Sequence, residues 1–577
     1  SVTGPFQPLA KAADIMGGES EAPPAYYGDV AVLAYPIAAK ANAGAVTAVS
    51  GTGSAIDLAA MTDNDLATAA SLSTDTGDAP PEIDLRYDQP QAIRSATLFV
   101  SGAVNMFSDP KYLPQLEARI GDAWQPVARL KLGQVPTTVS FAPVKASQFR
   151  IVFAPNTGPK RPELGAPGPG VAMSMDFARL PPADAIKVAE FRLSAVPQID
   201  HFEEKAGFAI ARNYYDFPTI PDSAGDAIAP DGVVNLTDHM RPDGTLDWTP
   251  PKGPQRWRIL RLGYSLLGTT NHPATSEATG LEVDKYDRDA VHGYITHYLG
   301  MYRDAVGDAL IGKHGIEALL TDSIEVGAAN WTPKMIDQFR RLRGYDPTPW
   351  LPALTGAIIG SRKQSNEFLY DFRRTLADLL ASEHYGEIAR VAHANDLTVY
   401  GEALEDLRPS LGDDMTMRSH TDVPMAALWA YDRAKGPRVT LLADMKGAAS
   451  VAHVYGKSYV AAESLTAFMQ PWAFGPADLR PMIDLEFANG INRPVIHTSV
   501  HQPLDKPPGL SLLIFGQYFN RLESWAGMAK PWVTYIARTS YLLQQGRDVA
   551  DIGYFYGEEA PLTSLYGNDP VADAPVS

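Results

Sequence analysis

Two kinds of hydrophobic pattern divide this chain of 577 residues. Between residues 45 and 195, short runs alternate apolar and polar positions and are separated by Gly, Pro, Asp and Ser. A period of two is typical of strands that bury one face, and closely spaced turn residues favour antiparallel connections. We therefore predict an antiparallel β-sandwich in this segment. Its runs are "EIDLRYD" (82–88), "SATLFVS" (95–101), "LEARIG" (116–121), "TTVSFAP" (137–143), "QFRIVFA" (148–154) and "AEFRLSA" (189–195).

The order of motifs in this segment resembles the discoidin-like, galactose-binding jelly roll of many carbohydrate-binding modules. "MTDNDLATAAS" precedes the strands, and "DAWQPVARL" and "VKASQFRIVF" lie among them. In that fold a loop such as "TDNDLAT" (62–68) often holds a structural calcium ion. Asp63 and Asp65 offer the oxygen ligands that suit Ca²⁺. An ordinary Asp/Asn turn explains these residues equally well, and both interpretations stay open.

Apolar runs alternate with helical patterns in the rest of the chain. Strands that are separated by helical segments, such as 287–307 and 332–344, predict parallel βα units. The predicted strands are "DVAVLAYPI" (29–37), "RWRILRLGYSL" (256–266), "IEALLTDSIE" (316–325), "LTVYGEAL" (397–404), "KSYVAAESL" (457–465) and "INRPVIHTS" (491–499).

This pattern predicts an α/β fold with a (β/α)₈ TIM-like barrel whose first strands are missing from the chain. Six strands are recognisable and eight are needed, so we expect the other two before residue 1. The sandwich would be an insertion in a βα loop, where insertions are tolerated. A doubly wound open sheet is disfavoured because no Gly-rich phosphate turn follows an early strand. The predicted domains are a barrel part (1–44), the inserted sandwich, similar to a carbohydrate-binding module (45–195), the main catalytic barrel part (196–540) and the start of a further β-rich domain (541–577).

Composition narrows the functional classes. The formal charge is −18, and an acidic surface repels phosphate backbones, so we expect no nucleic-acid partner. No apolar run approaches the roughly 18 residues of a membrane-spanning helix, so we expect no membrane insertion. The chain has no cysteine, which removes thiol catalysis, disulfides and Cys-ligated zinc. The first residues, "SVTGPFQPLAKAADIM", do not read as a signal peptide, and we expect a fragment or processed piece.

Carboxylates follow three successive predicted strands of the second half. Asp322 and Glu325 end one strand, Glu402 the next and Glu463 the third. Ligands of a parallel barrel bind at the carboxyl ends of its strands, and buried acids cost free energy unless they are solvated, paired or functional. Any single acid there is more often an ordinary strand end, but the agreement among strands favours a site. Cleavage of a glycosidic bond needs two carboxyl groups, one to protonate the leaving oxygen and one to activate water or attack.

Other residues near these strand ends allow more than one interpretation. Trp331 and Trp472 offer flat faces to a sugar ring, or they are core residues. His497 and His501 have the spacing of a helical zinc pair, but Pro503 and the loop-like "QPLDKPPG" argue against a helix. Hydrogen bonds to sugar hydroxyls suit these histidines better. A Ser-His-Asp hydrolase is disfavoured because no G-x-S-x-G motif is present.

Long motifs carry a resemblance to one family. They are "LRLGYSLLGTTNHPATSEATGLEVDKYD", "LLTDSIEVGAANWTPKMIDQFRRLRGYDPTPWLPALTG", "VYGEALEDLRPS", "TDVPM", "KGAASVAHVYGKSYVAAESLT" and "GINRPVIHTSVHQP". With these motifs the chain resembles glycoside hydrolase family 106, the bacterial α-L-rhamnosidases. The resemblance implies an inverting exo-hydrolase that releases terminal α-L-rhamnose from glycosides or polysaccharides. It also implies a (β/α)₈ barrel with β-sandwich domains, a longer parent protein and a periplasmic or secreted location.

The resemblance also assigns roles by position. Glu325 corresponds to the general acid, Glu463 to the base and Asp322 to a residue that orients or tunes the acid, and which glutamate is acid and which is base stays open. Some family members depend on calcium, so calcium is the expected cofactor. The resemblance does not say which residues of this chain would bind it. No organic cofactor is expected. Together with the strand-end pattern, the resemblance gives as candidate substrate-binding residues His272, Glu282, Asp284, Lys285, Trp331, Glu402, His497, His501 and Gln502.

One departure from the family pattern concerns the stretch after "DVPM". The family often reads Gly-Glu-Phe-Trp there, whereas this chain has Ala426, Ala427, Leu428 and Trp429. The carboxylate missing at Ala427 implies a different specificity or metal use. Two alternatives to rhamnoside hydrolysis stay open: a carbohydrate-binding protein without catalysis, and a barrel hydrolase that acts on another sugar.

Overall fold

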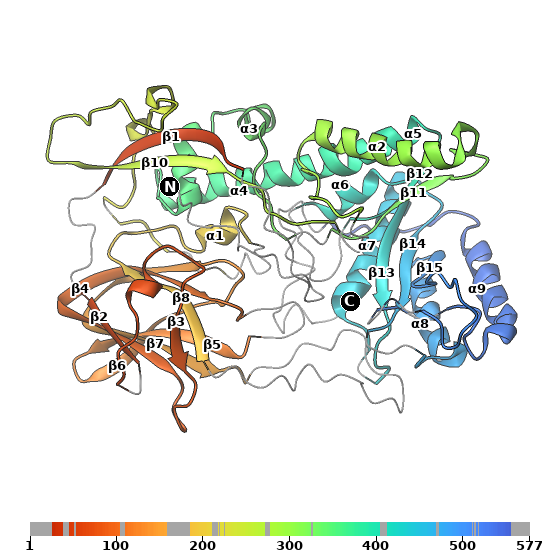
Figure 1. Ribbon diagram of the computed structural model, residues 1–577, viewed down its shortest axis with the longest axis horizontal. Coiled ribbons are helices and arrows are strands. Elements are labelled where there is room, and N and C mark those ends of the chain that lie inside the picture. Colours follow the sequence, from red (N-terminus) through yellow and green to blue (C-terminus); the bar gives the residue numbers. More distant parts are fainter. Residues whose placement is uncertain are drawn as a thin grey trace. The chain divides into compact units, whose positions relative to one another are not determined.

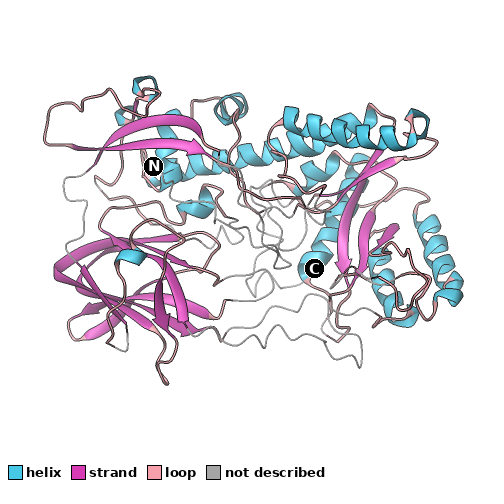
Figure 2. Cartoon of the chain, viewed as in Figure 1, coloured by secondary structure: helices cyan, strands magenta, loops and turns pink. Residues whose placement is uncertain are grey.

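The computed structural model describes residues 26–555 with several gaps (Figures 1 and 2). The chain divides into two units, each built from separate stretches of sequence. The first unit comprises Ser1–Pro159, Pro182–Glu282 and Val326–Leu376, and the second comprises Lys160–Pro181, Val283–Glu325 and Ala377–Ser577. The gaps are 38–45, 51–52, 104–109, 158–184, 210–216, 218–219, 224, 272–276, 325–326, 404–411, 435, 469–471, 511, 513–514 and 517–518.

An antiparallel β-structure lies in the first unit, as its alternating pattern predicts. The strand order is β3-β8-β4-β7-β5-β6, and β2 pairs with β4. Every one of these pairings is antiparallel. The strands are β2 (Val46–Ser50), β3 (Ala70–Ser73), β4 (Glu82–Val100), β5 (Tyr112–Ile120), β6 (Ala123–Arg129), β7 (Thr137–Pro155) and β8 (Ala185–Ser194).

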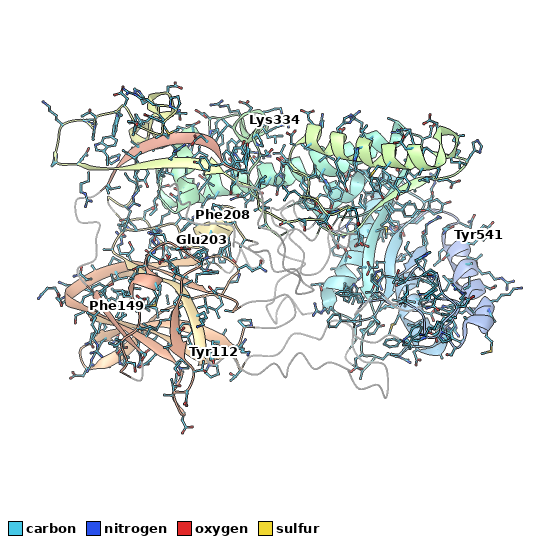
Figure 3. The ribbon with its side chains drawn as sticks, viewed as in Figure 1. Tyr112, Phe149, Glu203, Phe208, Lys334 and Tyr541 are labelled. Carbon is cyan, nitrogen blue, oxygen red and sulfur yellow. The ribbon has the colours of Figure 1, made fainter. Side chains whose placement is uncertain are left out.

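Two long strands explain why six predicted runs occupy only four strands. β4 and β7 each have 19 residues and each contain two of the predicted runs. The polar stretch 88–91, which reads as a turn, stays extended in β4 while its neighbours Tyr87 and Ile93 are buried. From Phe149 to Phe153 alternate side chains of β7 enter the apolar core, where Phe153 meets Tyr112 edge-on. Figure 3 labels Phe149 and Tyr112.

A second antiparallel sheet in the first unit corrects two predicted barrel strands. Its order is β10-β1-β9, formed by β10 (Arg256–Tyr264), β1 (Gly28–Ile37) and β9 (Val234–Asn235). The prediction that 29–37 and 256–266 are parallel barrel strands is therefore wrong. Both runs are apolar, and a short apolar run does not reveal whether its partner will be parallel or antiparallel. The helices α1 (Phe202–Lys205) and α3 (Met335–Arg343) also lie in this unit, and α4 (Arg362–Leu379) begins there.

A parallel sheet forms the centre of the second unit. β11 (Ala318–Thr321), β12 (Thr398–Glu402), β13 (Val423–Trp429), β14 (Ala461–Thr466) and β15 (Arg493–Ile496) lie side by side in chain order (Figure 1). Four of these strands agree with prediction, and β13 was missed although all seven of its residues are buried. The described residues therefore show a half-barrel of five strands, and the predicted eight-stranded barrel is not seen among them.

Helices follow the strands of this sheet, as the alternating pattern predicts. A described helix precedes β11, and others lie between β11 and β12 and after β12, β13, β14 and β15. No helix in the described part of the chain is long and apolar enough to cross a membrane. The helices are α2 (Arg288–Val306), α5 (Gly386–His393) after a π-helical turn (Leu380–Tyr385), α6 (Asp414–Ser419), α7 (Val439–Tyr455), α8 (Pro476–Ala488) and α9 (Lys530–Leu543).

A buried ion pair binds backbone groups in the middle of β13, where the pairing with β12 ends. Arg418 is fully buried and donates hydrogen bonds to the carbonyl oxygen of Met425 and to Asp444. The other oxygen of Asp444 accepts from the backbone N–H of Ala427 at 2.9 Å. Side chains thus satisfy backbone groups that a neighbouring strand would otherwise bind.

Candidate active site

Three carboxylates meet at the carboxyl ends of the parallel strands. Asp322 directly follows β11, Glu402 is the last residue of β12, and Glu463 lies in β14. One carboxylate oxygen from each residue lies within 4.8 Å of the other two. Parallel strands end at the same edge of a sheet, so residues far apart in the sequence converge there. The predicted convergence of these three acids is therefore present in the structure.

The bulge in β14 determines what surrounds Glu463. The register between β13 and β14 shifts after Leu428 and Ser464, and the extra residue, Leu465, has a φ of 69°. A non-glycine residue in this left-handed region costs about 1–3 kcal/mol, and such residues cluster at functional sites. After the bulge, the Thr466 hydroxyl donates a hydrogen bond to Oε1 of Glu463.

His497 completes this group of side chains from the end of β15. Its Nδ1 lies 3.2 Å from Oγ1 of Thr466 and 3.9 Å from Oε1 of Glu463. Burial lowers the pKa of His497, and the nearby charge of Asp322 opposes this effect. The imidazole is therefore neutral at neutral pH and able to both donate and accept hydrogen bonds.

One strand of the sheet contributes no polar group to the site. Ala427 of β13 pairs in register with Glu463 and is fully buried. The position at which the sequence was expected to depart from the family pattern therefore lies directly beside Glu463. The site is consequently built from the ends of four strands, β11, β12, β14 and β15.

The donor chemistry of the three carboxylates fits a hard cation. Three ionised carboxylates at this spacing repel one another, and a shared proton or a bound cation relieves the repulsion. Ca²⁺ binds carboxylate oxygens at about 2.3–2.6 Å, so two oxygens as much as 4.8 Å apart are able to contact one ion. Asp322, Glu402 and Glu463 are the residues that would hold it.

Other predicted site residues of the second unit have local contacts. Asp284 accepts a hydrogen bond from the backbone N–H of Tyr286 at 2.9 Å, just before α2. Both amide atoms of Gln502 bind the backbone of Leu510, at 2.6 and 2.7 Å, which closes a loop. His501 is exposed. Substrate roles for these residues stay predictions.

The structure places some of the remaining predicted site residues and leaves others outside the described ranges. In the first unit, Trp331 is half-buried and its ring stacks on Phe372 with centroids 6.2 Å apart, which fits the core alternative. In the second unit, the charge of Lys285 adds to the burial that lowers the pKa of His384 to about 3. Glu282 belongs to the first unit and Trp472 to the second, and Trp472 has a φ of 68°. Glu325 and His272 lie outside the described residues.

The predicted calcium loop of the sandwich has the contacts of a turn. Oδ1 of Asp63 accepts from the backbone N–H of Asp65 at 2.9 Å, and Oδ2 accepts from the Thr68 hydroxyl at 2.6 Å. The hydrogen bond from Thr68 lowers the pKa of Asp63. These contacts support the turn interpretation, and calcium binding there stays a prediction.

Sequence reasoning missed the residues that position the site. Thr466 and Leu465 lie in the motif "AAESLT", but nothing in the spacing announces a bulge that brings the hydroxyl back to Glu463. The Arg418–Asp444 pair was also missed. A cation and an acid in the helical stretches on either side of "VPMAALW" offered the only signal.

Comparisons with known proteins show what this chain is similar to. The solved structure of a rhamnosidase from Novosphingobium sp. PP1Y is 55% identical in sequence, with a TM-score of 0.86, and the match covers 99% of this chain and 50% of that one. A curated protein of Formosa agariphila, named "Putative beta-glucuronidase", is 38% identical over 374 residues, which is 64% of this chain and 30% of that protein. The chain thus spans half of the solved rhamnosidase and matches a smaller share of the curated relative.

The family model described as alpha-L-rhamnosidase, glycoside hydrolase family 106, matches residues 1–577. The match covers the whole chain, including the motifs that carry Asp322, Glu402 and Glu463. The resemblance seen in the sequence is confirmed: the chain belongs to glycoside hydrolase family 106, the alpha-L-rhamnosidase family.

Proposed function

We propose that this chain carries the catalytic centre of a glycoside hydrolase that releases terminal α-L-rhamnose with inversion. The observation that carries the proposal is the convergence of Asp322, Glu402 and Glu463 within 4.8 Å, in a chain of the α-L-rhamnosidase family. Acids that lie so close together are costly unless a ligand, a proton or a reaction uses them. The expected substrates are rhamnose-containing glycosides or polysaccharides, met in the periplasm or outside the cell.

The proposed architecture extends the observed half-barrel. In this proposal the five parallel strands are part of a (β/α)₈ barrel, and the site lies at the end of that barrel where enzymes of this fold bind their substrates. The sandwich of the first unit is proposed to be a carbohydrate-binding module. The order of the strands β11 to β15 supports the barrel, because sequential parallel neighbours are what successive βα units produce.

In the proposed reaction Glu463 is the general base and Glu325 the general acid. The oxygen of a water molecule attacks the anomeric carbon while Glu463 takes one of its protons. The bond between that carbon and the leaving oxygen breaks, and Glu325 gives its proton to that oxygen. The products are rhamnose and the free alcohol of the aglycone. Thr466 holds Oε1 of Glu463, and His497 stands beside both and is placed to bind water or a sugar hydroxyl.

Calcium is the proposed inorganic cofactor, held by Asp322, Glu402 and Glu463. A cation bound there would neutralise the carboxylates and bind sugar hydroxyls. Since Glu463 would then serve both the ion and the water, the proposal predicts that chelation alters turnover. No organic cofactor is required for hydrolysis.

A second candidate is hydrolysis of another sugar. The name of the Formosa agariphila relative supports it, and so does Ala427, which removes a family carboxylate next to Glu463. A glucuronide carries a carboxylate where rhamnose carries a methyl group, so a site with one acid fewer repels it less. A protein that binds glycans without cleaving them is the third outcome that an experiment must separate.

The test compares the chain with its Glu325→Gln and Glu463→Gln variants on aryl glycosides. Each variant should lose about 10²- to 10⁴-fold in kcat on an aryl α-L-rhamnoside, because each removes one proton-transfer group. Glu317→Gln is the matched control, an exposed carboxylate that precedes β11, at the opposite end of that strand from Asp322. Proton NMR of the first product, with and without chelator, reports the anomer and the role of calcium.

The outcomes distinguish the candidates. Initial release of β-rhamnose, lost in both variants and kept in Glu317→Gln, supports the proposal. Preferential cleavage of an aryl β-D-glucuronide supports the second candidate, hydrolysis of another sugar. Full activity of Glu463→Gln removes the assigned base, and glycan binding without product leaves only a binding protein.

A further inference from the structure

A fully buried carboxyl group lies behind the strand that carries Glu463 and has no part in the proposed reaction. Glu486 of α8 has no exposed surface. With Leu479, Met482 and Ile483 it forms the buried face of α8, at the spacing i, i+3, i+4 and i+7 that apolar residues occupy in an amphipathic helix. An acid at such a position breaks the local pattern, and positions that do so often have a functional role.

The burial of Glu486 costs free energy that its contacts only partly offset. No cation pairs with it among the described residues, and its Oε1 is buried without a hydrogen-bond partner within the same ranges. Burial raises the pKa of Glu486 well above its ordinary value, because an ionised carboxylate is poorly solvated there. The carboxyl group is therefore protonated at neutral pH and carries an O–H donor. An apolar residue would avoid the cost, so the presence of an acid needs an explanation.

Ser464 of β14 is the hydrogen-bond partner of this carboxyl group. Its Oγ lies 2.8 Å from Oε2 of Glu486 and 3.0 Å from the carbonyl oxygen of Ala462. A hydroxyl carries a single hydrogen, so it donates to only one of these oxygens. The protonated carboxyl group satisfies both contacts, since it donates to Oγ of Ser464 and leaves the serine hydrogen for the carbonyl oxygen. Two hydrogen bonds in series thus run from α8 to the backbone of β14.

The two residues that these hydrogen bonds join flank the proposed base. Successive side chains of a strand point to opposite faces, so Ala462 and Ser464 face α8 while Glu463 between them faces the site. Ala462 and Ser464 are fully buried, whereas the side chain of Glu463 is 15% exposed. The strand bulges immediately afterwards at Leu465, whose φ of 69° is costly for a residue with a Cβ. Hydrogen bonds on the buried face therefore hold the stretch of backbone that carries both Glu463 and the bulge.

We propose that Glu486 is a positioning residue of the hydrolase: its carboxyl group, through Ser464, holds the backbone of β14 so that the carboxylate of Glu463 keeps its place in the site. The inference rests on the proposed function, in which Glu463 is the general base. A small displacement of a catalytic group lowers the rate, because the reacting atoms must be aligned. Stability that an apolar residue would add at position 486 is given up for this alignment.

Steady-state hydrolysis of an aryl α-L-rhamnoside by the wild-type chain and by Glu486→Met tests this role. Methionine is nearly as long as glutamate and fills the space without a donor. We expect kcat to fall by about 3- to 10-fold, the effect of losing one neutral hydrogen bond, while KM changes less than about twofold because Glu486 lies behind the strand. The thermal midpoint should stay the same or rise, since the variant removes a buried oxygen that has no partner.

Two further variants and a second measurement separate positioning from packing. Glu486→Gln keeps a neutral N–H donor at the same place and should restore kcat to within about twofold of wild type. Asp484→Asn is the matched control, because Asp484 is an acid of the same helix that contacts Tyr535 and Arg480, and it should change kcat less than about twofold. The backbone amides of 461–466 should exchange hydrogen faster in Glu486→Met than in wild type or in Glu486→Gln.

Failure of this inference is distinguishable from failure of the proposed function. A wild-type chain that cleaves no glycoside removes the proposed function, and hydrogen exchange in 461–466 then still decides whether Glu486 holds the strand. With an active wild type, full kcat in Glu486→Met, equal losses in Glu486→Met and Glu486→Gln, or unchanged exchange would each overturn the positioning role alone. If Glu486→Met does not fold, Ser464→Ala breaks the same hydrogen bonds, and full kcat in that variant would overturn the role as well.

Discussion

The hydroxyl of Thr466 offers a direct test of how the fold positions the proposed base. It donates a hydrogen bond to Oε1 of Glu463 and lies 3.2 Å from Nδ1 of His497. Thr466→Val removes the hydroxyl and keeps the branched shape of a side chain that is 1% exposed. The perturbation therefore acts on Glu463 and His497 and leaves the packing of β14 nearly unchanged.

The size of the effect follows from the surroundings of that bond. A hydrogen bond to a charged group is worth about 1.5–3 kcal/mol. The side chain of Glu463 is 15% exposed, so water replaces part of the lost bond and the lower part of the range applies. A loss of about 1.5–2 kcal/mol corresponds to a 10- to 30-fold lower kcat, because each 1.36 kcal/mol is a factor of ten.

The assay is steady-state hydrolysis of an aryl α-L-rhamnoside, with kcat and KM measured separately. We expect kcat to fall by about 10- to 30-fold in Thr466→Val while KM changes less than about twofold, since the hydroxyl acts on the base and not on the bound sugar. Thr466→Ser keeps the hydroxyl and should restore kcat to within about threefold of wild type. A valine variant that folds normally and keeps kcat within twofold would refute the positioning role, and so would a serine variant as slow as the valine variant.

Two further predictions concern buried ionisable groups. Arg418→Met leaves Asp444 buried without its cation and should lower the free energy of unfolding by about 3–5 kcal/mol in urea titrations. The double variant Arg418→Met with Asp444→Leu should lose less stability than the single variant, because no unpaired carboxylate of Asp444 remains. A double variant that is less stable than the single one would contradict this account. Glu203 is 1% exposed, and burial raises its pKa to about 8, so the native state holds a proton that the unfolded state releases above about pH 4.5. The free energy of unfolding should therefore fall by up to about 5 kcal/mol relative to Glu203→Gln as the pH rises from about 4.5 to about 8, and an equal pH dependence of the two proteins would exclude this proton.

The carboxylate site could be predicted because acids at the ends of apolar runs are visible in the sequence. An acid that follows a short apolar run is visible in the letters, and the runs that end at Asp322, Glu402 and Glu463 recur between helical patterns. Parallel strands place such ends at one edge, so the three acids were expected to converge. The 4.8 Å spacing of their oxygens agrees with this expectation.

Other features were invisible because they depend on pairing partners. The runs 29–37 and 256–266 look like any buried strand, and only their mutual antiparallel register shows that they lie outside the parallel sheet. The bulge at Leu465 depends on a register shift against β13, a strand that was itself missed. The buried cations Lys205 and Arg418 look like surface residues in the sequence, since charge usually predicts exposure.

The sequence by itself determined the two hydrophobic patterns of the chain and the alternation of strands and helices in the second half. It also determined the family and which acids end which strands. These properties follow from local periodicity and from motifs of a few residues, which any chain carries before it folds. Only the tertiary structure decided the direction of the strands, the side chains that surround Glu463 and the burial of Lys205 beside Phe217. Each of these is a relation between residues distant in sequence, and burial sets its energy, so neither the partners nor the dielectric surroundings exist until the chain is packed.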